Sequence, residues 1–189
     1  MENYYDNHAQ EFFDGTVNAD MSDNYSDFLS LVKTGRILDA GCGSGRDSLA
    51  FCEKGYDVVA IDASLELCKL ASEYLGFEVL NMKFQDMDFK EEFDGIWAAS
   101  SLLHVPTNEL PDVLIKFRDS LKEGGVMHAS FKYGDFEGER NGRYFVDLDE
   151  KSSKTLFEEA GFEVLKIWTT NDVRKGREHE LWLNILVRK

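Results

Sequence analysis

Three glycines and an aspartate form the part of the sequence best suited to bind a small molecule. Gly41, Gly43 and Gly45 follow an apolar run that predicts a strand, and Asp62 ends the next apolar run along the chain. Glycine lets the backbone approach a ligand closely, and a carboxylate accepts hydrogen bonds from the hydroxyls of a ribose. The spacing therefore predicts a strand, a glycine-rich turn and a helix that together bind a nucleoside.

This pattern differs from that of a dinucleotide-binding site. Such a site requires Gly-x-Gly-x-x-Gly, in which the third glycine allows close packing of helix and strand, whereas Arg46 occupies that position here. Asp39 stands just before the turn, where a carboxylate would repel a pyrophosphate but could organise a ligand that carries an ammonium group. These two residues disfavour NAD, and an NAD-dependent oxidoreductase is kept as an alternative.

Helices and strands alternate along the chain, which predicts an α/β fold with a doubly wound, mostly parallel sheet of seven strands. The connection between the last two strands, 162–169 and 180–188, is too short and polar for a crossover helix, so we expect an antiparallel hairpin there. The apolar run 181–187 predicts that the last strand lies inside the sheet. The other strands are predicted at 36–40, 57–61, 77–82, 93–99 and 125–132, and the helices at 3–14, 21–33, 45–54, 65–75 and 150–160.

Local signals predict where some of these elements begin and how they are connected. Ser64 suits the N-cap of the helix that follows it. Thr107 or Asn108 is expected to cap the helix after the fourth strand, with Pro111 in its first turn. Residues 134–143 are predicted to form a polar, glycine-spaced loop.

Length and charge limit the class of protein and its partners. The 189 residues suit a single domain, with an N-terminal helical lid over 1–34 and a cofactor-binding core over 35–189. The formal net charge of −15 would repel phosphate backbones, so we expect no nucleic-acid partner. The N-terminus does not resemble a signal peptide and no stretch is apolar for long enough to cross a membrane, which predicts a cytoplasmic protein.

Cysteine and histidine spacing gives no indication of a metal or a disulfide. The three cysteines lack paired spacing, which fits free thiols in a reducing compartment. The four histidines are scattered, so no metal site is expected. The sequence is compatible with a monomer or a homodimer.

Several segments extend the glycine-rich pattern in a fixed order along the chain. They are Leu38–Gly45, Asp62, Phe84–Met87, Phe93–Val105, Leu121–Gly125 and Glu158–Phe162. Together they resemble the motifs of the class I S-adenosylmethionine-dependent methyltransferases. The resemblance implies that S-adenosylmethionine is the cofactor, that S-adenosylhomocysteine is a product, and that the methyl group moves by in-line displacement.

Two further features bear on the subgroup and the acceptor. The segment Gly45–Ser48 and the tyrosine-rich N-terminus are similar to small bacterial methyltransferases of the tellurite-resistance and thiopurine type. The Asn-Pro-Pro-Tyr or Asp-Pro-Pro-Tyr sequence of enzymes that methylate DNA bases and glutamine is missing after the fourth strand. We therefore expect a small-molecule acceptor such as a thiol or a chalcogen oxyanion, with RNA or protein as the alternative.

The resemblance also implies roles for individual residues. Asp62 matches the ligand of the ribose, and Asp86 matches the ligand of the adenine amino group, with Asp88 as the alternative. His104 follows the fourth strand at its carboxyl end, where it could act as a general base or orient the acceptor. The other cofactor-binding candidates are Tyr5, Asp39, Gly41, Cys42, Gly43, Arg46, Ala63, Met87 and Ala99, and the substrate-binding candidates are Tyr133, Arg143 and Tyr144.

Overall fold

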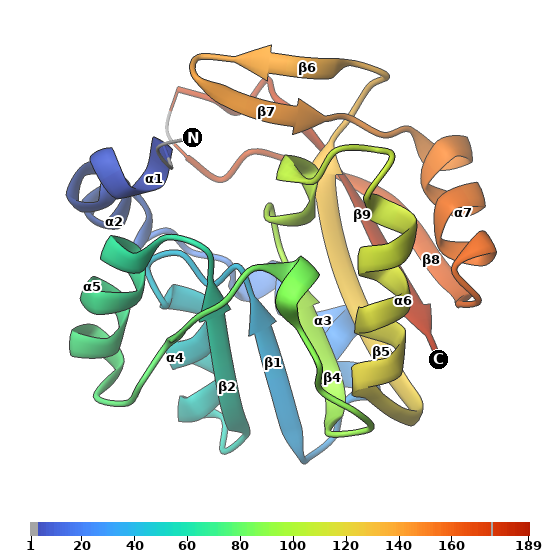
Figure 1. The fold of residues 1–189 in the computed structure, drawn as a ribbon, viewed down its shortest axis with the longest axis horizontal. Coiled ribbons are helices and arrows are strands. Elements are labelled where there is room, and N and C mark those ends of the chain that lie inside the picture. Colours follow the sequence, from blue (N-terminus) through green and yellow to red (C-terminus); the bar gives the residue numbers. More distant parts are fainter. Residues whose placement is uncertain (1–3, 175) are drawn as a thin grey trace.

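The computed structural model describes residues 4–174 and 176–189, in which seven strands form one sheet (Figure 1). The sheet strands are β1 (Arg36–Ala40), β2 (Asp57–Asp62), β3 (Leu80–Asn81), β4 (Phe93–Ala98), β5 (Leu121–Lys132), β8 (Glu163–Asn171) and β9 (Leu181–Arg188). Their order across the sheet is β3-β2-β1-β4-β5-β9-β8. Neighbouring strands from β3 to β5 run parallel, and β9 runs antiparallel to both β5 and β8. The predicted sheet, its C-terminal hairpin and the interior position of β9 are confirmed.

Helices cover both faces of this sheet. They are α1 (Tyr4–Asn7), α2 (Ala9–Thr16), α3 (Ser22–Leu31), α4 (Arg46–Glu53), α5 (Leu65–Leu75), α6 (Leu110–Ser120) and α7 (Glu150–Glu159). Figure 1 shows α6 and α7 in front of the sheet and α3 behind it. Phe117 and Phe157 belong to one buried apolar cluster, and Phe28 and Phe51 belong to another. Among the described helices, none has the length and apolar character needed to span a bilayer.

The ends of several helices follow the expected chemistry, and one does not. The Ser64 hydroxyl accepts a hydrogen bond from Leu67 N–H at 3.2 Å, so the predicted cap of α5 is confirmed. Pro111 lies in the first turn of α6, also as predicted. The prediction that Thr107 or Asn108 caps α6 was wrong, because the helix begins at Leu110 without a side-chain cap.

Three segments differ from the prediction, and the first of them lies at the top of Figure 1. Residues 134–143 were expected to be a loop, but β6 (Glu137–Arg140) and β7 (Arg143–Val146) form a two-stranded hairpin. The turn between them contains Asn141 and Gly142 with φ of 51° and 75°, which is typical of a tight hairpin turn. The expected helix over 3–14 begins outside the described residues and is divided into α1 and α2. The predicted strand over 77–82 is reduced to the two residues of β3.

His128 is a buried titratable group inside the sheet. Its ring stacks on Trp97 with the ring centroids 4.0 Å apart, and its Nε2–H donates to Asn184 Oδ1 at 3.2 Å. Within the described residues, Nδ1 has no hydrogen-bond partner. Burial lowers the pKa of His128 to about 4, because a second ring proton would have neither water nor an acceptor.

This histidine makes the stability of the protein dependent on pH. An unfolded histidine titrates near pH 6.5, so between about pH 6.5 and about pH 4 the unfolded state binds more protons and stability falls as the pH decreases. Between about pH 7.5 and about pH 5, His128→Phe should lose about 2 kcal/mol less unfolding free energy than the wild type. Urea unfolding at both pH values measures this difference, with the exposed His8→Gln as control. Equal losses in the His128→Phe and wild-type proteins would contradict the prediction.

Candidate functional site

The glycine-rich turn between β1 and α4 is hydrogen-bonded to the carboxyl end of β2. Gly41 N–H donates to the carbonyl oxygen of Ile61 at 2.9 Å, and Gly43 N–H donates to Asp62 Oδ2 at 2.9 Å. Gly41 has a φ of 76°, which glycine adopts without strain. A Cβ atom at Gly41 would lie 2.4 Å from Cβ of Ser101. This position therefore requires glycine for both its backbone angle and its surroundings.

Asp62 is held in place by backbone donors on both of its carboxylate oxygens. Besides the bond from Gly43, Ser64 N–H donates to Oδ1 at 2.9 Å. Burial raises the pKa of the Asp62 carboxyl, and the backbone donors oppose that effect. A carboxylate has about four lone-pair sites, so Asp62 keeps capacity to accept hydrogen bonds from a ligand. The carboxylate is positioned before any ligand binds.

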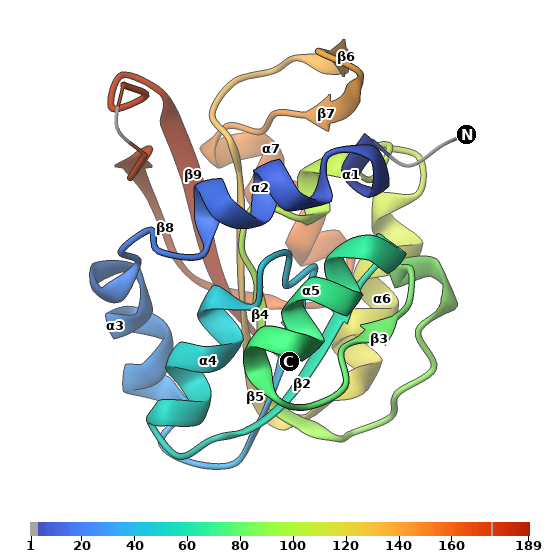
Figure 2. The same cartoon turned by 90° about the vertical axis from the view of Figure 1, so that its left-hand side faces the viewer.

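Two adjoining cavities lie at the carboxyl ends of the parallel strands, the edge at which open α/β sheets bind ligands. Figures 1 and 2 show α1, α2 and the β6–β7 hairpin at this edge. The larger cavity has a volume of about 460 Å³ and reaches Asp62, and the smaller has a volume of about 160 Å³ and reaches the ends of β5, β8 and β9. The residues common to both walls are Tyr5, Phe12, Gly41, Gly43, Ser100, His104 and Arg143.

Most of the residues predicted from the sequence line these cavities. The larger cavity is lined by the predicted residues Tyr5, Gly41, Gly43, Asp62, Ala63, His104, Arg143 and Tyr144. The smaller cavity adds Cys42, Arg46 and Ala99. Residues from five separate parts of the chain are thus brought to one place. The cavity walls show where these residues lie and do not show what role each has.

Four predicted residues lie outside both walls, namely Asp39, Asp86, Met87 and Tyr133. Asp39 is buried below the turn and accepts a hydrogen bond from Ser48 Oγ at 2.6 Å. Met87 is 1% exposed and belongs to the core. The Tyr133 hydroxyl donates to Glu150 at 3.0 Å. Asp39 thus binds Ser48 of α4, and Met82, Phe84 and Gln85 line the larger cavity in the region where Asp86 and Met87 were expected.

His104 lies in a short 3-10 helix, Leu102–His104, and its protonation state is fixed by its neighbours. Its Nδ1–H donates to the carbonyl oxygen of Tyr144 at 2.6 Å, so the lone pair is on Nε2, which accepts from the Tyr5 hydroxyl at 2.7 Å. Burial lowers the pKa of His104 to about 4. Burial also raises the pKa of Tyr5, although Arg143 opposes that shift. At neutral pH the pair is therefore an uncharged imidazole and an uncharged phenol.

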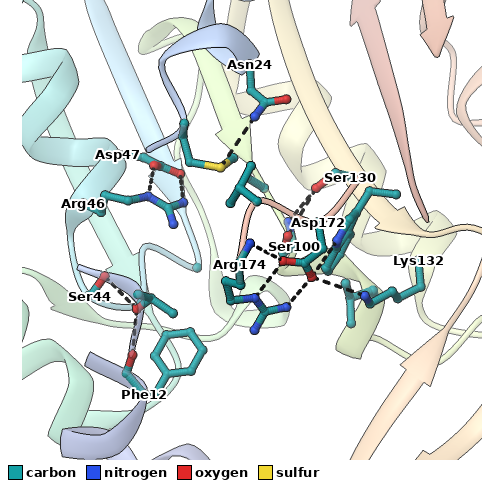
Figure 3. Close-up of a pocket in the computed structure, with 18 of the residues that line it drawn as sticks. Phe12, Asn24, Ser44, Arg46, Asp47, Ser100, Ser130, Lys132, Asp172 and Arg174 are labelled. Atoms are coloured by element: carbon teal, nitrogen blue, oxygen red, sulfur yellow. Dashed lines mark hydrogen bonds and ion pairs between the residues drawn. The ribbon is translucent and has the colours of Figure 1, made fainter. Parts of the chain in front are cut away.

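Arg46 and Asp47 form a charged pair at the wall of the smaller cavity (Figure 3). Arg46 donates to both carboxylate oxygens of Asp47, at 2.6 and 3.0 Å. The Tyr25 hydroxyl and the Trp97 indole N–H also donate to Asp47, at 2.7 and 2.8 Å. Burial opposes ionisation of Asp47, but Arg46 and these donors hold its pKa below the usual range. Burial raises the pKa of Asp39, and the negative charge of Asp47 raises it further.

A second charged group faces this pair across the smaller cavity (Figure 3). Arg174 donates to both oxygens of Asp172, at 2.9 and 2.6 Å, and the pKa of Asp172 is lowered although burial opposes the shift. Lys132 forms an ion pair with Glu180 and lies 3.6 Å from Asp172. Arg177 binds both oxygens of Glu180, at 2.6 and 2.9 Å. The connection between β8 and β9 thus contributes charged side chains to the wall of the smaller cavity.

Sequence reasoning missed several of these lining residues. Asp47 follows Arg46 directly, but its importance depends on donors that come from distant parts of the chain. The residues of the β8–β9 connection carry no local motif, and they reach the site only because β9 lies next to β5. Ser100 and Ser130 are linked across β4 and β5 by a hydrogen bond of 2.8 Å from Ser100 N–H to Ser130 Oγ.

Comparison with known proteins agrees with this architecture. Residues 37–125 match a family described as a methyltransferase domain. An uncharacterized methyltransferase of Staphylococcus carnosus is 32% identical over 154 residues, which cover 73% of this chain and 74% of that protein. A putative methyltransferase of Bacillus subtilis is 32% identical over 152 residues, which cover 73% of this chain and 59% of that protein.

Solved structures share the fold at lower sequence identity. A 1,6-didemethyltoxoflavin-N1-methyltransferase of Burkholderia thailandensis, with bound S-adenosylhomocysteine, has a TM-score of 0.78 and 21% identity over 98% of this chain and 83% of that chain. A TehB-like methyltransferase of Corynebacterium glutamicum has a TM-score of 0.73 and 19% identity over 97% of this chain and 96% of that chain. The chain belongs to the class I S-adenosylmethionine-dependent methyltransferases. The tellurite-resistance subgroup stays a prediction.

Proposed function

We propose that this methyltransferase acts on a small molecule, which binds in the smaller cavity while the adenosyl part of S-adenosylmethionine binds in the larger one. The observation that carries the proposal is that the two cavities meet at Tyr5, His104 and Arg143. The smaller cavity, of about 160 Å³, is enclosed by residues from the N-terminal helices, the sheet and the β6–β7 hairpin. Such a space suits a compact acceptor better than a segment of RNA or protein.

The residues of the larger cavity fit the cofactor. Asp62 offers carboxylate oxygens for a ribose diol, and the Gly41 and Gly43 backbone leaves the turn open on that side. Met82 and Phe84 supply an apolar wall for a nucleobase. When bound, the cofactor supplies a methyl group on a sulfonium, which is already activated for displacement. The main task of the protein is then to hold the two reactants in line and to exclude water.

His104 and Tyr5 are proposed to take up a proton where the acceptor must lose one. The Nε2 lone pair of His104 already accepts a hydrogen bond from the Tyr5 hydroxyl, and both residues line the junction. A proton leaving the acceptor would pass to the Tyr5 oxygen while the Tyr5 hydroxyl proton moves to the Nε2 lone pair, to which it is already hydrogen-bonded. The Tyr144 carbonyl holds the Nδ1 proton and so keeps the receiving nitrogen directed at the junction.

Two measurements test the function. Calorimetry should show saturable binding of S-adenosylmethionine and S-adenosylhomocysteine, with no binding of NADH. Incubation of a cell extract with methyl-labelled S-adenosylmethionine should place the label in the small-molecule fraction, and not in RNA or protein. Binding of NADH alone would support the oxidoreductase alternative, and label in either polymer would contradict the proposed acceptor class.

The role of His104 has its own test once the methylated product is known. For an acceptor that must lose a proton, His104→Gln should lower kcat by about 10²-fold. The affinity for S-adenosylhomocysteine should change by less than about threefold, because His104 also lines the larger cavity but its proposed role concerns the acceptor. Tyr133→Phe is a matched control, since that hydroxyl contacts Glu150 and lies outside both cavities. An unchanged kcat in His104→Gln would assign the histidine to shaping the pocket.

A further inference from the structure

We propose that the methyl acceptor is a small organic oxyanion, and that Arg143 binds its negatively charged group at the junction of the two cavities. This inference rests on the proposed function and specifies its substrate class. Three features support it: the surroundings of Arg143, a second arginine on the same hairpin, and the charge of the smaller cavity.

Arg143 is placed as a cation that lacks an anion. Among the described residues no carboxylate lies within ion-pair distance of it, and its buried Nε has no hydrogen-bond partner. Within the described part of the chain, its side chain makes one hydrogen bond, from an Nη atom to the Tyr5 hydroxyl at 3.4 Å, near the upper limit of such bonds. Arg143 is half-buried, and the burial of its unpartnered Nε costs free energy that a bound oxyanion would recover.

The rings around Arg143 leave the edge of its guanidinium for a ligand. Its Cζ lies 5.0 Å from the ring centroid of Tyr4, 5.9 Å from that of Tyr5 and 5.1 Å from that of Phe145. Rings attract the face of a guanidinium, whereas its N–H donors lie in the plane and match the two oxygens of a carboxylate or phosphate. Arg143 lines both cavities, so the bound group would lie beside the reacting centre.

Arg140, on the other side of the same turn, is an arginine of this hairpin whose charge is paired with a carboxylate. Its two Nη atoms donate to the two oxygens of Asp147, at 3.0 and 2.7 Å. It lies outside the walls of both cavities. Two arginines three positions apart thus have opposite surroundings: Arg140 is neutralised by a carboxylate, and Arg143 has its charge directed to the site.

The smaller cavity is positive in a strongly acidic chain. Its described lining includes five cationic residues and two carboxylates: Arg46, Lys132, Arg143, Arg174 and Arg177 against Asp47 and Asp172. Glu180 pairs with Lys132 and Arg177, so the group as a whole holds five positive charges against three negative ones. The whole chain has a formal net charge of −15. A concave site with an excess of charge of one sign concentrates ligands of the opposite sign. A negatively charged acceptor is therefore favoured at this one place, while the rest of the protein would repel it.

The test measures binding of simple oxyanions to the protein saturated with S-adenosylhomocysteine. Benzoate, phenyl phosphate and inorganic phosphate are titrated by calorimetry, with benzamide as the neutral counterpart of benzoate. At least one oxyanion should bind saturably and benzamide should not. Arg143→Gln should weaken that binding at least about tenfold, Arg143→Lys should weaken it less, and Arg140→Gln should leave it unchanged.

The affinity for S-adenosylhomocysteine separates this inference from the function on which it rests. In Arg143→Gln that affinity should stay within about threefold of the wild type. The inference is overturned if the variant loses affinity for S-adenosylhomocysteine to the same extent as for the oxyanion, since Arg143 would then bind the carboxylate of the cofactor. Benzamide binding as tightly as benzoate, or no oxyanion binding at all, overturns it as well. If S-adenosylhomocysteine does not bind the wild type, the proposed function fails, and the same titrations without it still test the anion site.

Discussion

Replacing Asp62 with alanine is expected to lower the affinity for S-adenosylmethionine by about 100-fold, or about 3 kcal/mol. The carboxylate is fixed by Gly43 and Ser64 N–H groups and directed into the larger cavity. Hydrogen bonds between a ribose diol and a carboxylate are charge-assisted, and the fixed Asp62 carboxylate would make them without prior rearrangement. Alanine removes these acceptors and leaves the Gly43 and Ser64 N–H groups without their partner.

Calorimetric titration with S-adenosylmethionine measures this loss, and two variants control it. Asp62→Asn keeps the shape of the side chain and one oxygen, so it should lose less affinity than alanine. Asp57→Ala removes a carboxylate from the opposite end of the same strand, where the side chain is 72% exposed, and it should leave affinity unchanged. Affinity of Asp62→Ala within about threefold of the wild type would remove Asp62 from the binding site.

Most of the sheet could be predicted because its strands other than β3 (Leu80–Asn81) have an apolar pattern with glycine or polar residues at their ends. The position of β9 inside the sheet followed from the apolar run 181–187, which pairs with β5 on one side and β8 on the other. The cap at Ser64 followed from a side chain that satisfies a free N–H group of the helix. These features depend on residues near one another in the sequence.

The β6–β7 hairpin was missed although the sequence contained a signal for it. Asn141–Gly142 is the dipeptide that most favours a two-residue hairpin turn, because both residues accept a positive φ. The segment before this turn, Glu137–Arg140, is polar, although it pairs with Arg143–Val146. It therefore lacks the alternation of apolar and polar residues by which a strand is usually predicted. The prediction for α6 failed for a related reason: Thr107 N–H donates to Glu137 of this hairpin at 3.0 Å, a contact that no local pattern encodes.

The sequence predicted the part of the candidate site around the glycine-rich turn. It did not predict the wall formed by the connection between β8 and β9. Gly41, Gly43 and Asp62 act through neighbouring backbone, so their spacing carried the information. Arg174 reaches the smaller cavity only through the order of strands in the finished sheet. For the same reason Asp47 could not be distinguished in the sequence from any other acid at the start of a helix.

Asp47 should contribute more to stability than any exposed carboxylate, because it is the common acceptor for three buried or half-buried donors. Removing it in Asp47→Ala is expected to lower the unfolding free energy by about 3–5 kcal/mol. The change leaves Arg46 without its counter-charge and leaves the donors of Tyr25 and Trp97 without an acceptor. Each unsatisfied buried donor alone costs about 1–3 kcal/mol.

Urea unfolding of single and double variants separates the contributions. Tyr25→Phe removes one neutral donor and should cost about 1 kcal/mol. Arg46→Met combined with Asp47→Ala removes both charges, so it should be more stable than Asp47→Ala by about 1–2 kcal/mol, since no unpaired cation is left at the cavity wall. If the double variant is instead less stable than Asp47→Ala, the stability of this region comes from the packing of the Arg46 side chain, and the ion pair is not what holds α4 to the core.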